Sequence, residues 1–274
     1  MDAQTSTHSA RDSGVPAAAR DFSVQNRVVI ITGAAQGIGR EFARQFAAAG
    51  AIPVLADFNA EGTQNVLGEI ESAGGRAMAV KVDVGDKTSI DEMARAVLAK
   101  YGRIDVLINN ASIFATLEKR PFDEIPLNEW ERVLRVNVTG SFFCVCAVVP
   151  AMREAKWGRI VNISSDSVPK GVANYLHYVT SKSALIGMTN AMARELGPHG
   201  ITVNCIRPGP VATEVDRAAN PTIELRTKQL GQQCIPKGQE PTDLVGLTMF
   251  LSSPASSFIT GQTIACDGGY THSS

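Results

Sequence analysis

The 274-residue chain has no strong excess of charge of either sign, since 26 Lys and Arg residues balance 27 Asp and Glu residues. A surface without such an excess offers no electrostatic footprint for nucleic acid or for an anionic membrane. The longest apolar run, from Phe142 to Met152, is too short to cross a bilayer and contains Pro150. We therefore expect no nucleic-acid partner and no membrane partner.

Residues that bind metals or form disulfides are scarce. The four histidines lack metal-ligand spacing, and the five cysteines include no Cys-x-x-Cys pair. We therefore predict no metal site, and buried free thiols in a reducing compartment. The first residues lack the apolar segment of a secretory signal, and their three aspartates argue against a mitochondrial transit peptide. We interpret residues 1–24 as a disordered N-terminal tail and predict a cytoplasmic protein.

Short apolar runs alternate with longer amphipathic stretches in residues 25–274. The pattern predicts strands at 28–32, 52–56, 77–82, 106–108, 160–163, 202–206 and 262–265, and helices at 37–49, 60–73, 87–101, 128–154, 175–196 and 242–252. Strands that alternate with helices of crossover length predict an α/β fold, a single domain built on a doubly wound parallel sheet. The stretch 211–240 contains several Pro and Gly residues and breaks this alternation. We interpret it as an inserted, partly helical lid over a substrate.

A glycine-rich turn, TGAAQGIG, follows the first predicted strand and opens the first predicted helix. Glycine lets the backbone approach a pyrophosphate, and the helix N-terminus offers free N–H groups and the positive end of a dipole. The spacing of Gly33, Gly37 and Gly39 is Gly-x-x-x-Gly-x-Gly, which differs from the standard dinucleotide fingerprint. The turn nonetheless has the context of a dinucleotide site.

Asp57 ends the second predicted strand, where a carboxylate can accept hydrogen bonds from a ribose diol and repels a 2′-phosphate. The flanking Phe58 and Gln36 are not basic, and Arg40 lies past the turn. NAD is therefore favoured over NADP. Asp83 ends the third predicted strand and would either meet the adenine amine or cap its own loop.

Tyr178 and Lys182 are four residues apart in YVTSK and share one helix face. An ammonium beside a phenol lowers the tyrosine pKa below its reference value near ~10, which prepares the hydroxyl to exchange a proton with an alcohol. One lysine is not enough for a large shift, so a bound cationic cofactor should lie nearby. The alternative is an ordinary solvated helix face.

Several motifs in order resemble the short-chain dehydrogenase/reductase family from about Gln25 to Tyr270. They are TGAAQGIG, Asp57, Asp83-Val84, Asn109-Asn110-Ala111, Asn137, Ser165, YVTSK, Pro208-Gly209 and ITGQ…DGG. The resemblance implies a seven-stranded Rossmann-type sheet, a nicotinamide cofactor, and a homotetramer formed through two long helices and the last strand. The dinucleotide contacts it implies are Gly33, Gln36, Gly37, Ile38, Gly39, Asp57, Phe58, Asp83, Val84, Asn110, Ala111, Tyr178, Lys182, Pro208, Gly209, Val211 and Thr213.

The same resemblance implies roles for four catalytic residues. Tyr178 would be the general acid/base, and Lys182 would lower its pKa and bind the nicotinamide ribose. Ser165 would hydrogen-bond the substrate oxygen, with its neighbour Ser164 as the alternative. Asn137 would hold a water in the proton relay. NAD would then remove a hydride while Tyr178 accepts the hydroxyl proton.

Substrate-side residues are predicted to be mostly apolar. They are Ile113, Phe114, Val168, Leu176, Pro210 and Val211. They favour a hydrophobic or aromatic secondary alcohol as the small-molecule substrate. Two departures from the family, Ser112 after Asn-Asn-Ala and Asp166 after Ser165, lie on this side. His177 is expected to have a structural or surface role.

Two alternatives stay open at this point. The first is an NADPH-dependent 3-oxoacyl-carrier-protein reductase, against which Asp57 argues. The second is a catalytically silent dinucleotide-binding protein with the same fold, against which the intact set of catalytic residues argues.

Overall fold

The apolar runs of the chain pair into a single parallel sheet. The structure, a computed structural model, describes residues 21–216, 218 and 223–272. Within that part, seven strands pair in the order β3-β2-β1-β4-β5-β6-β7. Their bounds are β1 Val28–Thr32, β2 Ile52–Asp57, β3 Met78–Lys81, β4 Val106–Asn109, β5 Gly158–Ile163, β6 Ile201–Pro208 and β7 Thr263–Cys266. The doubly wound α/β fold predicted from the sequence is confirmed.

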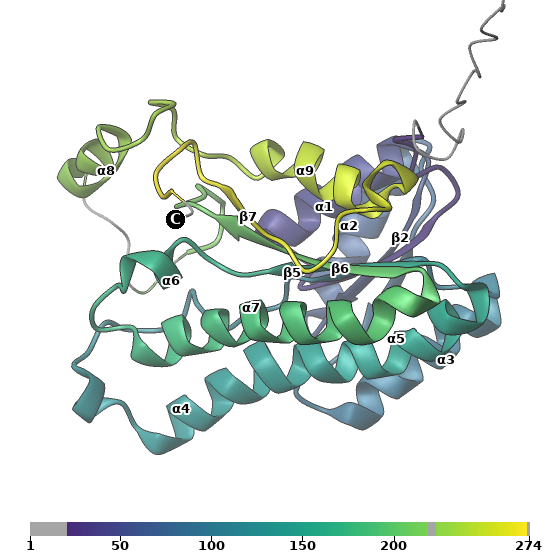
Figure 1. The fold of residues 1–274 in the computed structure, drawn as a ribbon, viewed down its shortest axis with the longest axis horizontal. Helices are drawn as coiled ribbons and strands as arrows, with labels where there is room; N and C mark the ends of the chain where they lie inside the picture. Colours follow the sequence, from purple (N-terminus) through teal and green to yellow (C-terminus); the bar gives the residue numbers. More distant parts are fainter. Residues whose placement is uncertain (1–20, 217, 219–222, 273–274) are drawn as a thin grey trace, which may run out of the picture.

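Helices cover both faces of the sheet (Figure 1). On one face lie α1 (Gly37–Ala48), α2 (Ala60–Ser72) and α9 (Thr242–Ser252). On the other lie α3 (Lys87–Tyr101), α4 (Leu127–Leu134), the π-helical turn η3 (Arg135–Gly140), α5 (Ser141–Ala155) and α7 (Leu176–Leu196). Shorter elements are η2 (Phe122–Glu124), α6 (Ser167–Lys170), η4 (Gly197–His199), α8 (Ile223–Leu230) and η5 (Pro254–Ser256). The right-handed connections that a parallel sheet requires account for this two-sided cover.

The central strands are apolar on both faces because both faces are packed. In β1, Val28 and Ile30 join the core under α3, α5 and α7, whereas Val29 and Ile31 join the core under α1, α2 and α9. All five residues of β1 are buried. This alternation explains why the strand reads as a continuous apolar run instead of an alternating one.

The helical run Leu127–Ala155 is long and apolar enough, by length and composition, to cross a membrane. In the fold, however, Cys144, Val148 and Met152 of α5 are fully buried in the core on one face of the sheet. Packing against the sheet therefore accounts for much of the apolar character of this helix.

The packed part of the chain begins before residue 24, where the disordered tail was predicted to end. Residues 1–20 of that tail lie outside the described residues, but residues 21–24 pack against α9 and the segment that follows it. Val24 is buried, the rings of Phe22 and Phe250 lie 6.0 Å apart, and the Ala255 amide donates to the carbonyl of Asp21. The predicted tail therefore contains a short packed segment at its end.

The chain reverses its winding direction between β1 and β4, which are neighbours at the centre of the sheet. Connections leave these two strands toward opposite sides, so a crevice opens beyond their carboxyl ends. The turn after β1, the loop after β4 and the residues after β5 and β6 all reach this crevice.

Candidate functional site

The turn between β1 and α1 and the first turn of α1 are so closely packed that one position in each admits only glycine. Gly33 has a φ of +69°, and a Cβ there would lie 2.9 Å from the Ala111 Cα. A Cβ on Gly39 would overlap the carbonyl oxygen of Gly33. The backbone beside the N-terminus of α1 therefore carries no side chain at these two positions. We call this segment the glycine cradle, and such a segment can accommodate a diphosphate.

The loop after β4 is tied directly to this turn. The Asn110 side-chain amide donates to the carbonyls of Thr32, at 2.9 Å, and Gly33, at 3.1 Å. The Thr32 hydroxyl in turn accepts the N–H groups of Asn110 and Ala111, each at 3.0 Å. These hydrogen bonds hold the predicted cofactor residues Asn110 and Ala111 at the carboxyl edge of the sheet.

Asp57 lies at the end of β2, beside the same turn. One carboxylate oxygen accepts the Ala35 N–H at 3.0 Å and the other accepts the Asn59 N–H at 2.9 Å. Phe58 follows with 68% of its surface exposed, and the Lys81 ammonium lies 5.5 Å from its ring. These two hydrogen bonds fix the carboxylate beside the turn, and its contact with a ribose stays a prediction.

Asp83 and Val84, also predicted to contact the cofactor, lie beyond the end of β3. The Asp83 carboxylate accepts the N–H of Gly85 at 2.8 Å, which is the loop-capping role named as an alternative. Val84 is buried with the core residues. A role of either residue in binding adenine stays a prediction.

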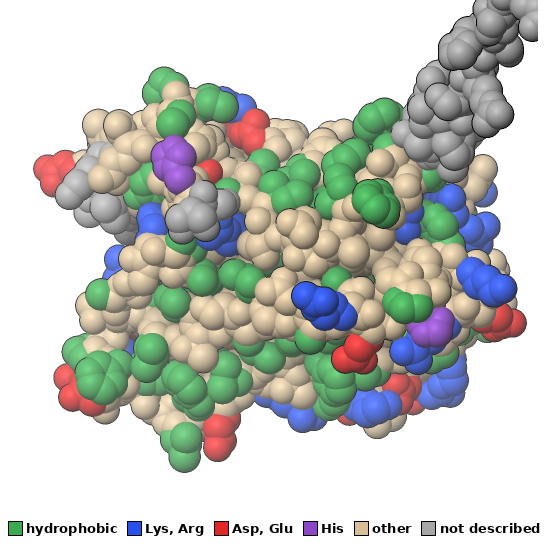
Figure 2. Space-filling view, in the orientation of Figure 1, with side chains coloured by type: hydrophobic (Ala, Val, Ile, Leu, Met, Phe, Trp, Pro, Cys, Tyr) green, Lys and Arg blue, Asp and Glu red, His purple; other side chains and the backbone are tan. Residues whose placement is uncertain are grey.

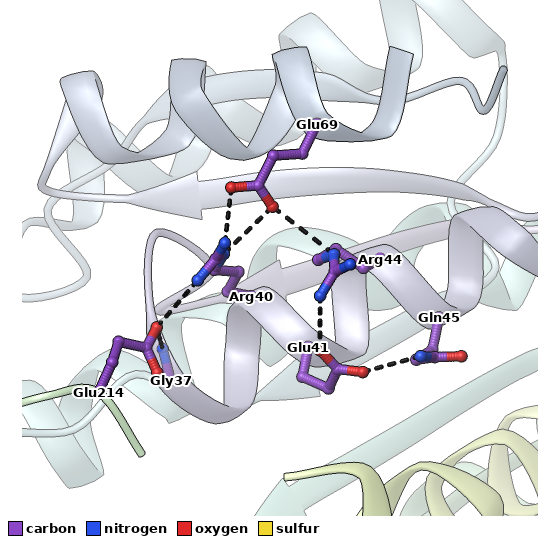
Figure 3. Close-up of polar contacts among 7 residues, drawn as sticks. All are labelled: Gly37, Arg40, Glu41, Arg44, Gln45, Glu69 and Glu214. Atoms are coloured by element: carbon purple, nitrogen blue, oxygen red, sulfur yellow. Dashed lines mark hydrogen bonds and ion pairs between the residues drawn. The ribbon is translucent and has the colours of Figure 1, made fainter. Parts of the chain in front are cut away.

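An ion-pair network surrounds the first turns of α1, as Figure 3 shows. Arg40 pairs with Glu69 at 2.7 Å and with Glu214 at 3.4 Å. The hydrogen bond that Arg40 donates to Glu69 is the main cause that raises the Arg40 pKa above its ordinary value. Glu214 also accepts the Gly37 N–H at 3.0 Å. The Arg40 charge is therefore balanced by two acids, and one of them lies at the N-terminus of α1.

On α7, Tyr178 and Lys182 share one buried helix face, with 9% and 3% of their surfaces exposed. The Lys182 ammonium lies 5.7 Å from the centre of the Tyr178 ring and donates to the Ile163 carbonyl at 2.9 Å. Burial lowers the pKa of Lys182 to about 8. The solvated helix face considered from the sequence is thus wrong for this pair.

The two serines after β5 have different surroundings. The Ser164 hydroxyl donates to the backbone carbonyl of Lys182 at 2.8 Å, so it is used inside the fold. The Ser165 hydroxyl accepts the Ser167 N–H at 3.1 Å and donates to an Asp166 carboxylate oxygen in a long hydrogen bond of 3.4 Å, which a substrate oxygen can replace. Ser165 is therefore the better placed of the two to donate to a substrate oxygen.

Asn137 lies in the π-helical turn η3 and is buried. Its side-chain oxygen accepts the Ile113 N–H at 2.8 Å, and its nitrogen donates to the Ser181 hydroxyl at 3.0 Å. The side chain thus joins the loop after β4 to α7. Its place in a proton relay stays a prediction, because it does not line the cavity that holds Tyr178 and Lys182.

A cavity of about 450 Å³ joins these groups. Its lining includes Ser165, Tyr178 and Lys182 together with the cofactor-side residues Ile38, Asn110, Pro208, Gly209 and Val211. Thr213 lies outside this lining, beside Gly37.

The substrate side of the cavity differs from the sequence expectation. Phe114, Pro210 and Val211 line it as predicted, but Ile113, Val168 and Leu176 do not. Ser112 and Asp166, placed on this side as departures from the family pattern, also line it, and Gln229 reaches it from the predicted lid 211–240. Reasoning from the sequence did not name Lys119, Ile163, Ser167, Lys170, Val172 and Tyr175, which complete this side of the lining.

His177 also lies on α7, but it does not line the cavity. It is fully buried, and its Nε2 atom lies 3.3 Å from a carboxylate oxygen of Glu129 on α4. Its role is therefore structural, at the contact between α4 and α7, and the surface alternative is wrong.

Comparison with known proteins gives a consistent set of relatives. A family model described as enoyl-(acyl carrier protein) reductase matches residues 33–271. The (2S)-[(R)-hydroxy(phenyl)methyl]succinyl-CoA dehydrogenase subunit BbsD of Thauera aromatica is 38% identical over 90% of this chain and 98% of its own length.

Two solved structures superpose closely on this one. A protein described as a short-chain alcohol dehydrogenase from Sinorhizobium meliloti 1021 has a TM-score of 0.86 at 33% identity, covering 91% of this chain and 98% of that one. A 3-ketoacyl-(acyl-carrier-protein) reductase from Brucella melitensis complexed with NADH has a TM-score of 0.82 at 29% identity, covering 91% and 100%.

Proposed function

Because the chain belongs to the short-chain dehydrogenase/reductase family, we propose that it interconverts a hydrophobic or aromatic secondary alcohol and its ketone with NAD as cofactor. Members of this oxidoreductase family bind a nicotinamide dinucleotide. The observation that carries the proposal is that Ser165, Tyr178 and Lys182 line one cavity beside the glycine cradle. A protein that had lost catalysis would have no need to keep these three together.

When bound, the nicotinamide ring accepts or supplies the hydride. The residues of this chain handle the proton and the oxygen. In the oxidative direction the Tyr178 side chain starts as a phenolate and takes the proton from the alcohol, which leaves it as the neutral phenol, while the Ser165 hydroxyl donates to the alcohol oxygen as it becomes a carbonyl. Lys182 holds positive charge near the Tyr178 ring, and its buried position excludes water that would screen it.

Preference for NAD is supported by the charges around the cradle. The Asp57 carboxylate lies at the end of β2 beside the glycine-rich turn, and a carboxylate at the end of this strand accepts hydrogen bonds from a ribose diol and repels a 2′-phosphate. Arg40, the nearest guanidinium on α1, is already paired with Glu69 and Glu214. The Brucella relative was solved with NADH. A rate comparison of NAD and NADP tests this part of the proposal.

An aromatic substrate is supported by the wall that Phe114 and Tyr175 form beside Tyr178. The name of the Thauera relative describes a substrate with a hydroxy(phenyl)methyl group, a secondary alcohol on a benzylic carbon. The alternative, an NADPH-dependent 3-oxoacyl-carrier-protein reductase, shares the cavity and has relatives of its own. Lys81 favours this alternative in one respect. It lies opposite Asp57 on the neighbouring strand β3, and a basic side chain there could attract the 2′-phosphate of NADPH.

The test is an NADH-fluorescence screen over alcohols and ketones with three variants. Tyr178→Phe should retain NADH binding and lose turnover by about 10³-fold, because the proton-transfer group is gone. Ser165→Ala should lose about 10²-fold. The matched control Ser164→Ala removes a neighbouring hydroxyl that is bonded to the backbone and should lose only a few-fold. Near-parent activity of Tyr178→Phe would contradict the proposal.

We also propose a cytoplasmic homotetramer that acts without nucleic acid, membrane or metal. All five cysteines are free, which suits a reducing compartment. Cys144 and Cys205 are buried as expected, but Cys146 and Cys234 are exposed, so the expected burial is wrong for these two. Exposed apolar side chains on the helices that the resemblance assigns to the subunit contact support the oligomer.

A further inference from the structure

Besides Lys182, two lysines line the cavity, and their charges are used differently. The Lys170 ammonium pairs with the buried Asp166 carboxylate at 2.6 Å and lies 3.5 Å from the centre of the Tyr270 ring. That charge is therefore neutralised within the protein. The second lysine, Lys119, lines the same cavity from the loop between β4 and α4.

The acids near Lys119 in the sequence and the fold are already engaged. Glu118 pairs with Arg120 at 3.2 Å, and Glu129 lies 3.7 Å from Arg120 and 3.3 Å from His177. Within residues 21–216, 218 and 223–272, Lys119 forms no ion pair. The Lys119 ammonium lies 5.7 Å from the centre of the Tyr175 ring. Lys119 thus leaves an unbalanced positive charge in the cavity wall.

An aromatic surface connects this charge to the predicted reaction centre. The Phe114 ring lies 4.6 Å from the Tyr178 ring and 5.9 Å from the Tyr175 ring, and the two tyrosine rings are 6.4 Å apart. The distance from the Lys119 ammonium to the Tyr178 ring is therefore at most the sum of two distances, Lys119 to the Tyr175 ring and the Tyr175 ring to the Tyr178 ring. A ligand with its carbinol at Tyr178 and its apolar body on Phe114 and Tyr175 would reach Lys119 at its other end.

We propose that Lys119 is a specificity-determining residue and that the substrate is a secondary alcohol or ketone with an anionic group at the end remote from the carbinol. This inference rests on the proposed function and narrows it from a neutral hydrophobic alcohol to an acidic one. The anion replaces the missing partner of Lys119, while the aromatic wall binds the connecting carbons. A carboxylate and a phosphate ester share this chemistry.

The test compares matched ketones that differ only in the remote group. They are 4-oxo-4-phenylbutyrate, the neutral butyrophenone and 3-oxo-3-phenylpropyl phosphate. The parent protein should show a KM for one of the two anions about tenfold below that for butyrophenone, and the better anion identifies the source. In Lys119→Gln the KM ratio should fall toward one, and in Lys119→Glu it should invert.

Two further variants separate charge recognition from a structural effect. Lys119→Arg keeps the charge and should keep the preference. Lys100→Gln is the matched control, because Lys100 also lies over a tyrosine ring, 5.2 Å from Tyr101, but on α3 away from the cavity. It should leave all three KM values at the parent level. The parent preference should also weaken with added salt.

Equal KM values for the three ketones, or a preference that survives in Lys119→Gln, would overturn the inference and leave the proposed function intact. If none of the ketones is turned over with either NADH or NADPH, the proposed function fails. Calorimetric titration then still tests whether Lys119 binds an anionic group, since 4-phenylbutyrate should bind the parent about tenfold more tightly than it binds Lys119→Gln. Equal affinities of the two proteins for 4-phenylbutyrate would refute the anion site.

Discussion

The burial of the Lys182 ammonium lowers the stability of the folded protein. Its side chain is fully enclosed, and burial lowers its pKa from 10.5 to about 8. The unfolded chain keeps the proton up to the higher value, whereas the folded chain releases it above the lower one. Stability should therefore rise as the pH increases from about 8 to 10.5, and below pH 8 the full cost of burying the charge is present.

Replacement of Lys182 by Met should stabilise the cofactor-free protein at pH 7 by about 2 kcal/mol. Relief of the burial cost contributes about 3 kcal/mol, and loss of the hydrogen bond to the Ile163 carbonyl removes about 1 kcal/mol. The advantage should disappear by pH 10.5, while turnover is lost at every pH. Urea unfolding at pH 7 and pH 10 measures this. Lys100→Met, at an exposed position, should show no such pH dependence, and a less stable Lys182→Met at pH 7 would contradict the argument.

The sequence predicted the central residues of the site because they lie in short motifs on regular elements. Tyr178 and Lys182 share a helix face by their spacing alone, and Ser165 follows a strand. The outer lining was not predictable in the same way. Lys119 reaches the cavity from a loop, and the path of such a segment depends on packing that no local pattern specifies. Gln229 reaches it from α8, inside the stretch predicted as a lid, but the sequence did not indicate which residue of that stretch would line the cavity.

The carboxylate of Glu214, which follows β6 in the chain, lies at the N-terminus of helix α1. A dinucleotide would need positive potential at this helix end. Burial acts to raise the pKa of Glu214, but the Gly37 N–H and Arg40 outweigh it, so the pKa is below its usual value. The carboxylate is therefore charged throughout the neutral range. It uses the Gly37 N–H at the positive end of the helix dipole and opposes a second anion there.

Replacement of Glu214 by Gln should therefore tighten NADH binding by about threefold, measured by fluorescence titration. Glu69→Gln is the matched control, because Glu69 also pairs with Arg40 but does not contact Gly37 (Figure 3). It should bring no gain in affinity, since Glu214 still occupies the helix terminus. Weaker binding in Glu214→Gln would show that the carboxylate helps to hold the site closed around the cofactor.

The regular elements followed from apolar periodicity, and their predicted bounds agree with the structure within about two residues. The long helix predicted at 128–154 is the exception, since the π-helical turn η3 divides it. The extra residue of such a turn changes the helix register, and here it brings the Asn137 side chain onto the backbone of Ile113. Apolar spacing did not reveal that turn, because both halves keep a buried face.

Viewed as a whole, the molecule exposes apolar side chains on the helical layer below the sheet. Hydrophobic groups gather over α4 in Figure 2, and Leu127, Phe142 and Leu176 of this layer have 69%, 46% and 42% of their surfaces exposed. Phe258, between η5 and β7, is completely exposed. Large apolar groups on adjacent helices are typical of a surface covered by another subunit.

Light scattering coupled to gel filtration should accordingly give about four times the chain mass of 29.1 kDa. Phe142→Glu places a charge in the surface on α5 and should reduce the assembly to smaller species, because a buried unpaired carboxylate opposes association. Phe58→Glu is the matched control, since Phe58 is also exposed but lies beside Asp57 at the cofactor edge. It should keep the parent mass and weaken NADH binding instead. A parent protein that elutes as a monomer, or a Phe142→Glu variant with unchanged mass, would place the subunit contact elsewhere or remove it.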